Sequence, residues 1–522
     1  MEKEFNTEGP CRPEQHYMAD TSAKFKAILR LVELGKYFTI NRPRQYGKTT
    51  MLFRVAEVFR QTGQYMVFRI SFEGVGDSPF ANEEQFCAMF LEALRFRAEQ
   101  QQETALVKAL DEMLLIAQNL KTLSLCISTL VHTAQRKIVV LIDEVDKSSN
   151  NQLFISFLGI LRDKYLDRSE TPTFHSVVLV GVHDVKSLKL KLRPDAEKKY
   201  NSPWNIAADF KVDMNLLPPE IRPMLEEYAR DRDVTVDAQA VAERLFYYTS
   251  GYPFLVSKLC KMFDEELLPE KTERTWTTHD VDAAARQLLG ETNTNFDETI
   301  KNLRNHPELY DLVEKMLIEG MDFSFDLHSD RINLGITFGI LAPNQYNRLG
   351  IHNRIYRELI LNYMSSNAEH TSPIAGREFS DSYCLPGNRF DVRRALLKFQ
   401  ELLKAEYSKK DRDFLERQGR LVFLAFLRPL LNGHGHAFKE PQSSEERRLD
   451  VVISYHQHRH VIELKIWRGP EAYLKGLDQL AAYLDDLGLD EGALLIFDHG
   501  GLKRWQHEDI VHQGKRILAV WV

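Results

Sequence analysis

The chain has 522 residues and a formal net charge of −7, with 43% hydrophobic and 27% charged residues. This composition is typical of a soluble globular protein, and the length predicts two to four domains. It excludes a global basic field that would indicate a nucleic-acid binder, although a local groove can be basic on an acidic protein. The five cysteines are scattered without metal-binding spacing, and no apolar run of about 18 residues occurs. We therefore expect a cytoplasmic protein with no membrane partner.

A phosphate-binding loop is predicted near residue 45. Residues 36–40 resemble a short strand, and a helical stretch follows from Thr49 to about Gln61. The segment NRPRQYGKTT between them supplies a glycine and the start of a helix, where backbone amides bind phosphate. Lys48 would contact the β- and γ-phosphates, although Arg42 stands where such loops usually have their first glycine. We expect the following residues to bind ATP: Arg44, Gln45, Tyr46, Gly47, Lys48, Thr49 and Thr50.

A second nucleotide signal is the apolar run IVVLIDEVD, which predicts a buried strand ending in Asp143 and Glu144. Parallel sheets bind ligands at this end of their strands. Asp143 and Thr49 would hold Mg²⁺, and Glu144 would orient and deprotonate the attacking water. A solvated strand end is the alternative for either carboxylate alone. A third strand ends in His183 and Asp184, which either sense the γ-phosphate or form a turn.

The domain boundaries follow changes in pattern. Residues 1–215 form the predicted ATPase core, and the helical pattern of residues 216–300, broken at SGYPF, predicts a lid beside it. Helix, hairpin and helix in residues 301–365 predict a winged-helix-like module, which serves either as a DNA contact or as a spacer. Residues 366–388 are rich in Ser, Pro, Gly and Asn and predict a linker to the domain of residues 389–522.

The carboxy-terminal domain is predicted to contain a helix, three strands, a second helix and two further strands. Asp450 and Glu463 fall on neighbouring strands, and Lys465 shares a strand face with Glu463. Gln479 and Tyr483 are four residues apart, so they share a helical face that can turn toward the carboxylates. The alternative is a surface hairpin in which Glu463 and Lys465 only pair across solvent.

These residue types suit phosphodiester cleavage. Asp450 and Glu463 would ligate Mg²⁺ or Mn²⁺, with Glu416 as a further ligand. Lys465 would stabilise the charge of the transition state, and Gln479 and Tyr483 would position the phosphate.

Both halves resemble known families. Asp450, the Glu463-Leu464-Lys465 triplet and the Gln479-x-x-x-Tyr483 element resemble the PD-(D/E)XK nuclease superfamily, including its RecB-like members. The front half resembles bacterial AAA-ATPase-like proteins in which an RPRxxGKT loop replaces the full Walker A motif, so Arg42 is expected there. The resemblance implies an α/β fold with a P-loop AAA-type ATPase core, a helical lid and a restriction-endonuclease-like domain. It also implies a role in defence against phage or mobile DNA.

The predicted function is ATP binding and hydrolysis that control a metal-dependent nuclease acting on nucleic acid, with DNA preferred to RNA as the partner. The expected cofactors are ATP and Mg²⁺ or Mn²⁺, and a homo-oligomer is compatible with the sequence. One alternative is a nucleotide-dependent switch or scaffold whose nuclease-like domain binds without cutting. Another is an ATPase that remodels DNA.

Overall fold

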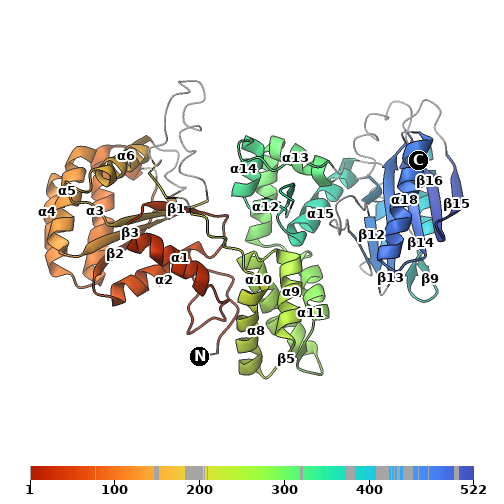
Figure 1. Cartoon of the computed structure of the whole chain (residues 1–522), viewed down its shortest axis with the longest axis horizontal. Coiled ribbons are helices and arrows are strands. Elements are labelled where there is room, and N and C mark those ends of the chain that lie inside the picture. Colours follow the sequence, from red (N-terminus) through yellow and green to blue (C-terminus); the bar gives the residue numbers. More distant parts are fainter. Residues whose placement is uncertain are drawn as a thin grey trace. The chain divides into compact units, whose positions relative to one another are not determined.

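The chain forms two compact units in a computed structural model (Figure 1). The first comprises residues 1–299, 326–342 and 352–355, and the second comprises the rest, up to Val522. The structure describes the following residues: 2–76, 78–145, 152–182, 204, 206–208, 210–317, 321–344, 346–371, 383–406, 422–424, 426–427, 430–431, 435–438, 451–456, 458–467, 469–498 and 505–522.

The first unit is built on a parallel four-stranded sheet with the order β1-β4-β3-β2. Ala208 adds a parallel bridge to Phe38 of β1. The strands are β1 (Phe38–Asn41), β2 (Tyr65–Ser71), β3 (Lys137–Asp143) and β4 (Ser176–Gly181). Because all four strands are parallel, their carboxyl ends meet at one edge, where the expected phosphate-binding residues follow β1 and β3.

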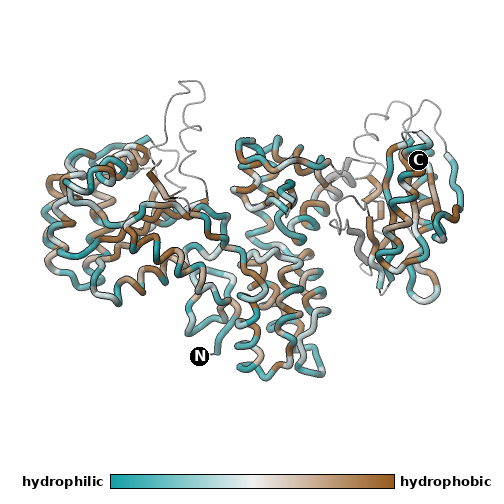
Figure 2. The backbone as a smooth tube through the Cα atoms, in the orientation of Figure 1, coloured by the Kyte–Doolittle hydropathy of each residue, from teal (hydrophilic) through white to brown (hydrophobic). Residues whose placement is uncertain are grey.

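Helices cover both faces of this sheet (Figure 1). One face carries α1 (Ser22–Glu33) and α2 (Lys48–Gln61). The other carries α3 (Glu83–Gln100), α4 (Thr104–Ile116), α5 (Leu120–Ala134) and α6 (Gln152–Leu166). A doubly covered parallel sheet requires strands that are apolar on both faces, and the strands of this sheet are largely hydrophobic in Figure 2.

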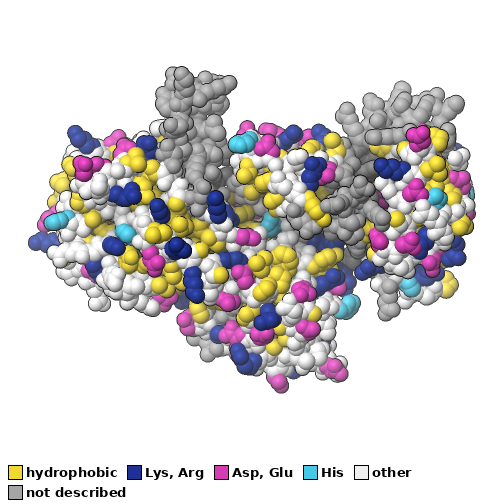
Figure 3. All heavy atoms as spheres, viewed as in Figure 1, with side chains coloured by type: hydrophobic (Ala, Val, Ile, Leu, Met, Phe, Trp, Pro, Cys, Tyr) yellow, Lys and Arg dark blue, Asp and Glu magenta, His cyan; other side chains and the backbone are white. Residues whose placement is uncertain are grey.

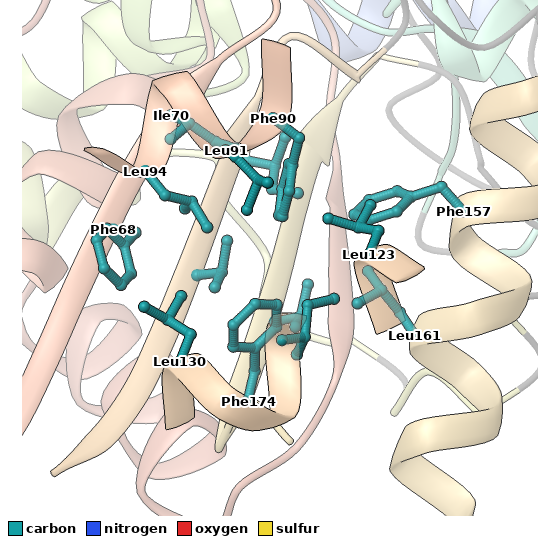
Figure 4. Packing of buried hydrophobic residues seen from close by; sticks show 14 of the residues in the cluster. Phe68, Ile70, Phe90, Leu91, Leu94, Leu123, Leu130, Phe157, Leu161 and Phe174 are labelled. Atoms are coloured by element: carbon teal, nitrogen blue, oxygen red, sulfur yellow. The ribbon is translucent and has the colours of Figure 1, made fainter. Parts of the chain in front are cut away.

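The main core of the unit lies between the sheet and α3–α6. Phe68 and Ile70 of β2 pack against Phe90, Leu91 and Leu94 of α3 in this core (Figure 4). Trp204 is fully buried in the same cluster and stacks on Tyr37 with the ring centroids 5.8 Å apart. Trp204 therefore serves packing in this core.

A helical bundle follows the sheet along the chain. Its helices are α8 (Pro218–Arg232), α9 (Ala238–Thr249), α10 (Pro253–Met262) and α11 (Thr278–Leu288), with a small parallel pair formed by β5 (Thr235–Val236) and β6 (Thr275–Trp276). Pro253 begins α10, because a first-turn residue needs no amide proton and the fixed φ of proline suits the helix. The predicted break at SGYPF is therefore the α9–α10 turn.

The next region contains more helix than expected. Its elements are α12 (Thr294–Asn305), α13 (Pro307–Leu317), α14 (Asp330–Thr337), β7 (Leu341–Pro343), β8 (Leu349–Ile351) and α15 (Arg354–Thr371). An additional helix, α14, ends at Thr337, directly before the expected hairpin. The chain turns at Gly339, whose φ of 72° ends the helix before β7 begins.

The second unit contains a mixed six-stranded sheet with the order β11-β12-β13-β14-β16-β15. The strands are β11 (Gly435–Phe438), β12 (Val451–Tyr455), β13 (His458–Ile466), β14 (Glu491–Phe497), β15 (His507–His512) and β16 (Lys515–Trp521). The pairs β13–β14 and β14–β16 are parallel, and the other pairs are antiparallel. A short antiparallel pair, β9 (Cys384–Leu385) and β10 (Arg389–Phe390), precedes the sheet.

The prediction of two strands after the second helix is wrong, because β15 lies between β14 and β16 in the chain. Its residues HEDIVH are mostly exposed at the sheet edge, so no apolar alternation marks it in the sequence. The two faces of the sheet are covered by α16 (Val392–Glu406) and α18 (Pro470–Asp486), which pack in separate hydrophobic clusters. Among the described residues of both units, no helix is long and apolar enough to cross a membrane.

Candidate functional site

The phosphate-binding loop is shaped by two left-handed backbone positions. Gln45 has a φ of 58° and Gly47 a φ of 72°, a conformation that costs a residue with a Cβ about 1–2 kcal/mol and costs glycine almost nothing. Gly47 caps the amino terminus of α2, so the first amides of that helix face the loop. This geometry forms an anion site at a helix amino terminus.

The polar side chains predicted for the phosphates and Mg²⁺ lie together. Lys48 donates hydrogen bonds to the carbonyl oxygens of Arg42 (2.8 Å) and Pro43 (2.7 Å). Thr49 Oγ1 donates to Asp143 Oδ2 at 2.9 Å, and the Glu144 amide donates to Asp143 Oδ1 at 3.0 Å. A hydroxyl and a carboxylate in contact supply the oxygen donors that Mg²⁺ prefers, so these residues fit the metal of a nucleotide complex.

A cavity of about 590 Å³ opens beside the loop. This volume is within the range of small-molecule sites. Besides the loop itself, its lining includes Glu144, Pro253 and Phe254 of α10, and the amino-terminal segment Asn6–Cys11. The amino-terminal segment is fixed to the loop by a 3.0 Å hydrogen bond from the Cys11 amide to Thr50 Oγ1. This wall has no signal in the sequence, because it lies outside any nucleotide motif.

Two predicted ATP-binding side chains are held by residues of α12. Arg44 Nε lies 3.0 Å from Glu298 Oε1, and Asn295 donates a 2.8 Å hydrogen bond to Gln45 Oε1. Both loop residues still line the cavity. Their side chains therefore fix the loop to α12.

Tyr46 connects the loop to His352. Its hydroxyl donates to Asn215 Oδ1 at 2.7 Å, which leaves His352 Nε2, 2.9 Å away, as the donor to the tyrosine oxygen. Asn353 completes the arrangement by donating to His352 Nδ1 at 3.2 Å. Burial lowers the pKa of His352 to about 4, opposed by the charge of Asp213. His352 is therefore neutral at physiological pH.

Arg42, which replaces the usual first glycine, contacts backbone carbonyl groups and an aromatic ring. Its guanidinium donates to the carbonyl oxygens of Asn41 (2.7 Å) and Val212 (2.6 Å) and lies 5.3 Å from the centre of the Phe210 ring. Burial lowers the pKa of Arg42, with the charge of Asp213 opposing that effect. Arg42 thus fixes the start of the loop against a segment about 170 residues later in the chain.

The second predicted site is centred on β13. Glu463 is 1% exposed, and Lys465 Nζ lies 2.7 Å from its Oε1. The same ammonium donates a 3.0 Å hydrogen bond to Gln479 Oε1 on α18. Gly476, one turn earlier on α18, lies beside the lysine stem, since a Cβ there would be in ordinary van der Waals contact with Lys465 Cε at 3.5 Å. The surface-hairpin alternative does not fit a carboxylate this deeply buried.

Of the other residues predicted for this site, Tyr483 lies within the described residues and Asp450 and Glu416 do not. Tyr483 is 5% exposed and packs with Val452 and Val461 in the cluster under α18. Asp450 and Glu416 lie outside the described residues, as do His183 and Asp184 of the first unit. Within the described ranges, no group of three or more His, Cys, Asp or Glu side chains forms a metal centre.

Comparison with known proteins identifies the first unit. The AAA-like domain family matches residues 8–332, and no curated protein matches the chain. Solved structures similar to it include the Walker-type ATPase PABY2304 of Pyrococcus abyssi, which shares 12% identity with a TM-score of 0.46 over 68% of this chain and 99% of that chain. The ORC2 protein of Aeropyrum pernix shares 14% identity with a TM-score of 0.38 over 70% and 98% of the two chains. The RuvB Holliday junction branch migration motor of Thermotoga maritima shares 14% identity with a TM-score of 0.35 over 67% and 97%.

These structural likenesses are distant, and the family match carries the assignment. Its span of residues 8–332 includes the loop, the parallel sheet and the helices α8–α11. Since it covers more than half of the 522 residues, the chain belongs to the AAA-like domain family, with a P-loop ATPase-like α/β core in its first unit.

Proposed function

We propose that the protein binds and hydrolyses ATP in its first unit and uses the nucleotide to control a metal-dependent nuclease in its second unit. The observation that carries the nuclease proposal is the buried Glu463 paired with Lys465, which in turn contacts Gln479. Burying an ion pair costs desolvation that its own attraction seldom exceeds. A buried carboxylate paired with a partly exposed lysine is therefore better explained by a catalytic role than by a contribution to the stability of the fold.

At the ATP site, Lys48 would contact the β- and γ-phosphates, and Thr49 and Asp143 would hold Mg²⁺. When bound, Mg²⁺ neutralises charge on the phosphates. Glu144 lines the cavity directly after Asp143, a position suited to orienting and deprotonating the attacking water. The side chains of Arg44, Gln45, Tyr46 and Thr50 would act indirectly, by fixing the loop whose amides bind the phosphates.

At the nuclease site, Glu463 and Asp450 would ligate Mg²⁺ or Mn²⁺, with Glu416 as a further ligand. Asp450 directly precedes Val451, which pairs with Ile462, the neighbour of Glu463. Carboxylate oxygens suit either ion, and the bound metal would lower the pKa of a water. Lys465 would stabilise negative charge on the scissile phosphate, held in position by Gln479. Tyr483 would position the phosphate backbone.

Control by nucleotide would begin at α12. Asn295 and Glu298 of this helix contact the phosphate-binding loop, and α12 continues to Asn305 as one helix. A change of loop conformation when ATP binds would therefore change the contacts of α12. A helix moves as a rigid element, so its far end would report on the nucleotide.

One observation favours a second candidate, a nucleotide-dependent switch that binds nucleic acid without cutting it. Lys465 Nζ pairs with Glu463 Oε1 at 2.7 Å. The lysine thus contacts a carboxylate that a bound metal would need as its ligand. A role in defence against phage or mobile DNA rests only on the resemblance to bacterial ATPase–nuclease fusions, and we propose it on that basis. DNA is the proposed substrate for the same reason.

Cleavage assays separate these two functions. Purified protein is incubated with Mg²⁺ or Mn²⁺, ATP and labelled single-stranded DNA, duplex DNA or RNA. We expect Lys465→Ala to reduce cleavage at least about 100-fold, the loss typical for one transition-state contact. Lys465→Met, which keeps the apolar stem over Gly476, should lose the same activity, whereas the exposed Lys475→Ala on α18 should retain it. Nucleic-acid binding without cleavage under either metal would favour the switch.

A further inference from the structure

The outer edge of the sheet in the first unit is closed by side chains. Strand β2 is the last strand of the order β1-β4-β3-β2, so the main-chain groups on its outer side have no neighbouring strand. The carbonyl oxygen of Val67 accepts a hydrogen bond from Gln101 Nε2 at 3.1 Å, and that of Arg69 accepts one from Arg97 Nε at 2.7 Å. Arg60, at the end of α2, also reaches Val67 O, at 3.5 Å. Closing an edge protects it from pairing with other strands, but a single amide or hydroxyl would suffice for that.

Arginines gather at this edge around one aromatic ring. The guanidinium carbons of Arg12 and Arg69 lie 6.0 Å and 5.6 Å from the centre of the Phe53 ring on α2. With Arg60 and Arg97 they form what we call the arginine patch: Arg12, Arg60, Arg69 and Arg97. Basic side chains with hydrophobic neighbours are visible over the α1–α2 side of this unit in Figure 3.

Within the described ranges, the arginine patch has no acidic side chain in ion-pair contact, in contrast to other arginines of the same unit. Among the described residues, no carboxylate oxygen lies within 4.0 Å of any of its four guanidinium groups. By comparison, Arg95 contacts Asp111 at 2.5 Å and Arg222 contacts Glu226 at 3.1 Å. The patch therefore concentrates positive charge, with no ion pair from the described residues, on a protein whose net charge is −7.

Three of the four charges, those of Arg60, Arg69 and Arg97, also act on one another. Burial lowers the pKa of Arg60, and Arg69 and Arg97 lower it further, with only Glu57 opposing. Burial likewise lowers the pKa of Arg97, and Arg69 adds to that effect. Like charges held this close are unfavourable in the isolated molecule. An anion bound between them would relieve that repulsion.

We propose that the arginine patch binds the phosphate backbone of nucleic acid. Guanidinium groups form paired hydrogen bonds with phosphate oxygens, and a partly exposed Phe53 between two of them offers an apolar surface to sugar or base. This inference deepens the proposed function by giving the ATPase unit its own contact with the substrate, and it rests on that function only for the substrate class.

The position of the arginine patch links it to the ATP site. Phe53 lies on α2, the helix that begins at Lys48 of the phosphate-binding loop. Arg12 directly follows Cys11, which lines the ATP cavity and donates to Thr50 Oγ1. Nucleic acid at the patch and ATP in the cavity would thus contact nearby residues of the same two segments, residues 11–12 and residues 48–53. We expect nucleic acid to change the rate of ATP hydrolysis through these segments.

The test uses the full chain and a fluorescein-labelled duplex DNA, with binding measured by anisotropy without added divalent metal, so that cleavage plays no part. The variant R12Q/R69Q removes two charges whose guanidinium groups lie near the Phe53 ring and form no ion pair within the part of the chain that the structure describes. At about 0.15 M salt we expect at least about tenfold weaker binding and a salt dependence smaller by about two phosphate contacts. R12K/R69K keeps the charges and should restore most of the affinity.

The matched control is R95Q/R222Q, which removes two exposed, ion-paired arginines of the same unit. It should bind DNA as the wild type does, and circular dichroism should show that every variant is folded. Equal binding by R12Q/R69Q and wild type would overturn the proposal, as would an equal loss in the control. Unchanged DNA binding with a smaller oligomer, by light scattering, would assign the patch to contact with a second copy of the chain. Failure to cleave DNA, by contrast, would affect only the nuclease proposal.

Discussion

The ATP site and the nuclease-like site differ in how their residues are brought together. Lys48, Thr49 and Gly47 are consecutive, and the loop that holds them takes its shape from its own backbone, with Asp143 as one distant partner. Glu463 and Lys465 instead depend on a buried strand and on Gln479 of a packed helix. A backbone-built site depends less on distant side chains than a site built from side chains, which depends on all the elements that carry them.

The largest expected effect is the loss of ATP binding in Lys48→Ala. Lys48 is the only lysine in the loop sequence and is 6% exposed within it, so its removal should reduce ATP hydrolysis at least about 100-fold. A fluorescent ATP analogue measures binding, and phosphate release measures hydrolysis. The exposed Lys26→Ala on α1 should behave as wild type. Full hydrolysis in Lys48→Ala would refute the ATP site described above.

A smaller effect is expected where the loop rests on another element. Gly339 has a φ of 72°, and a Cβ there would lie 2.8 Å from Pro43 Cγ, at the start of the loop. Gly339→Ala should therefore weaken ATP binding about tenfold by displacing Pro43, in addition to about 1–2 kcal/mol of backbone strain. Calorimetric titration with ATP gives the affinity.

Gly63→Ala is the matched control for that substitution. Gly63 has a similar φ of 67° but nothing within 4 Å of its Cβ position. It should carry the strain without the change in affinity. If both variants bind ATP equally well, contact with Gly339 does not position the loop.

The smallest effect concerns pH and compares one histidine in each unit. Burial lowers the pKa of His352 and of His460 to about 4, below the value of about 6.5 in an unfolded chain. Between about pH 6.5 and about pH 4, each histidine is therefore protonated in the unfolded chain but neutral in the folded chain. Each histidine should therefore reduce the free energy of unfolding as pH falls from about 6.5 to about 4, by at most about 3 kcal/mol.

Thermal unfolding across that pH range checks the expectation. ATP should raise the melting temperature of the first unit and so distinguish its transition from that of the second. His352→Gln should flatten the pH dependence of the ATP-sensitive transition, and His460→Gln that of the other. An unchanged pH dependence in His352→Gln would show that this histidine titrates normally in the folded protein.

The sequence predicts the core of the ATP site because that site is largely local. The GKT triplet after a strand and the carboxylate at the end of an apolar run specify the loop and its partner without tertiary information. Arg42 could not be interpreted this way, since its partners Phe210 and Val212 lie far along the chain. The same holds for the wall formed by residues 6–11, which is identified only by proximity.

Prediction was less complete in the second half of the chain. Strand β15 carries no apolar alternation because its residues lie at an exposed sheet edge. Glu463, Lys465 and Gln479 were predicted from spacing and resemblance, and the structure places them in contact. Their spacing alone could not reveal that Glu463 is buried, because burial depends on α18 packing over the strand.

The central claim is that ATP controls cleavage, and the most direct test measures metal-dependent DNA cleavage with and without ATP. Wild type, Lys48→Ala and Lys465→Met are compared under the same Mg²⁺ or Mn²⁺ conditions. The account predicts ATP-dependent cleavage by wild type, cleavage that no longer responds to ATP in Lys48→Ala, and no cleavage by Lys465→Met. Cleavage that persists in Lys465→Met, or that responds to ATP equally in wild type and Lys48→Ala, would contradict it.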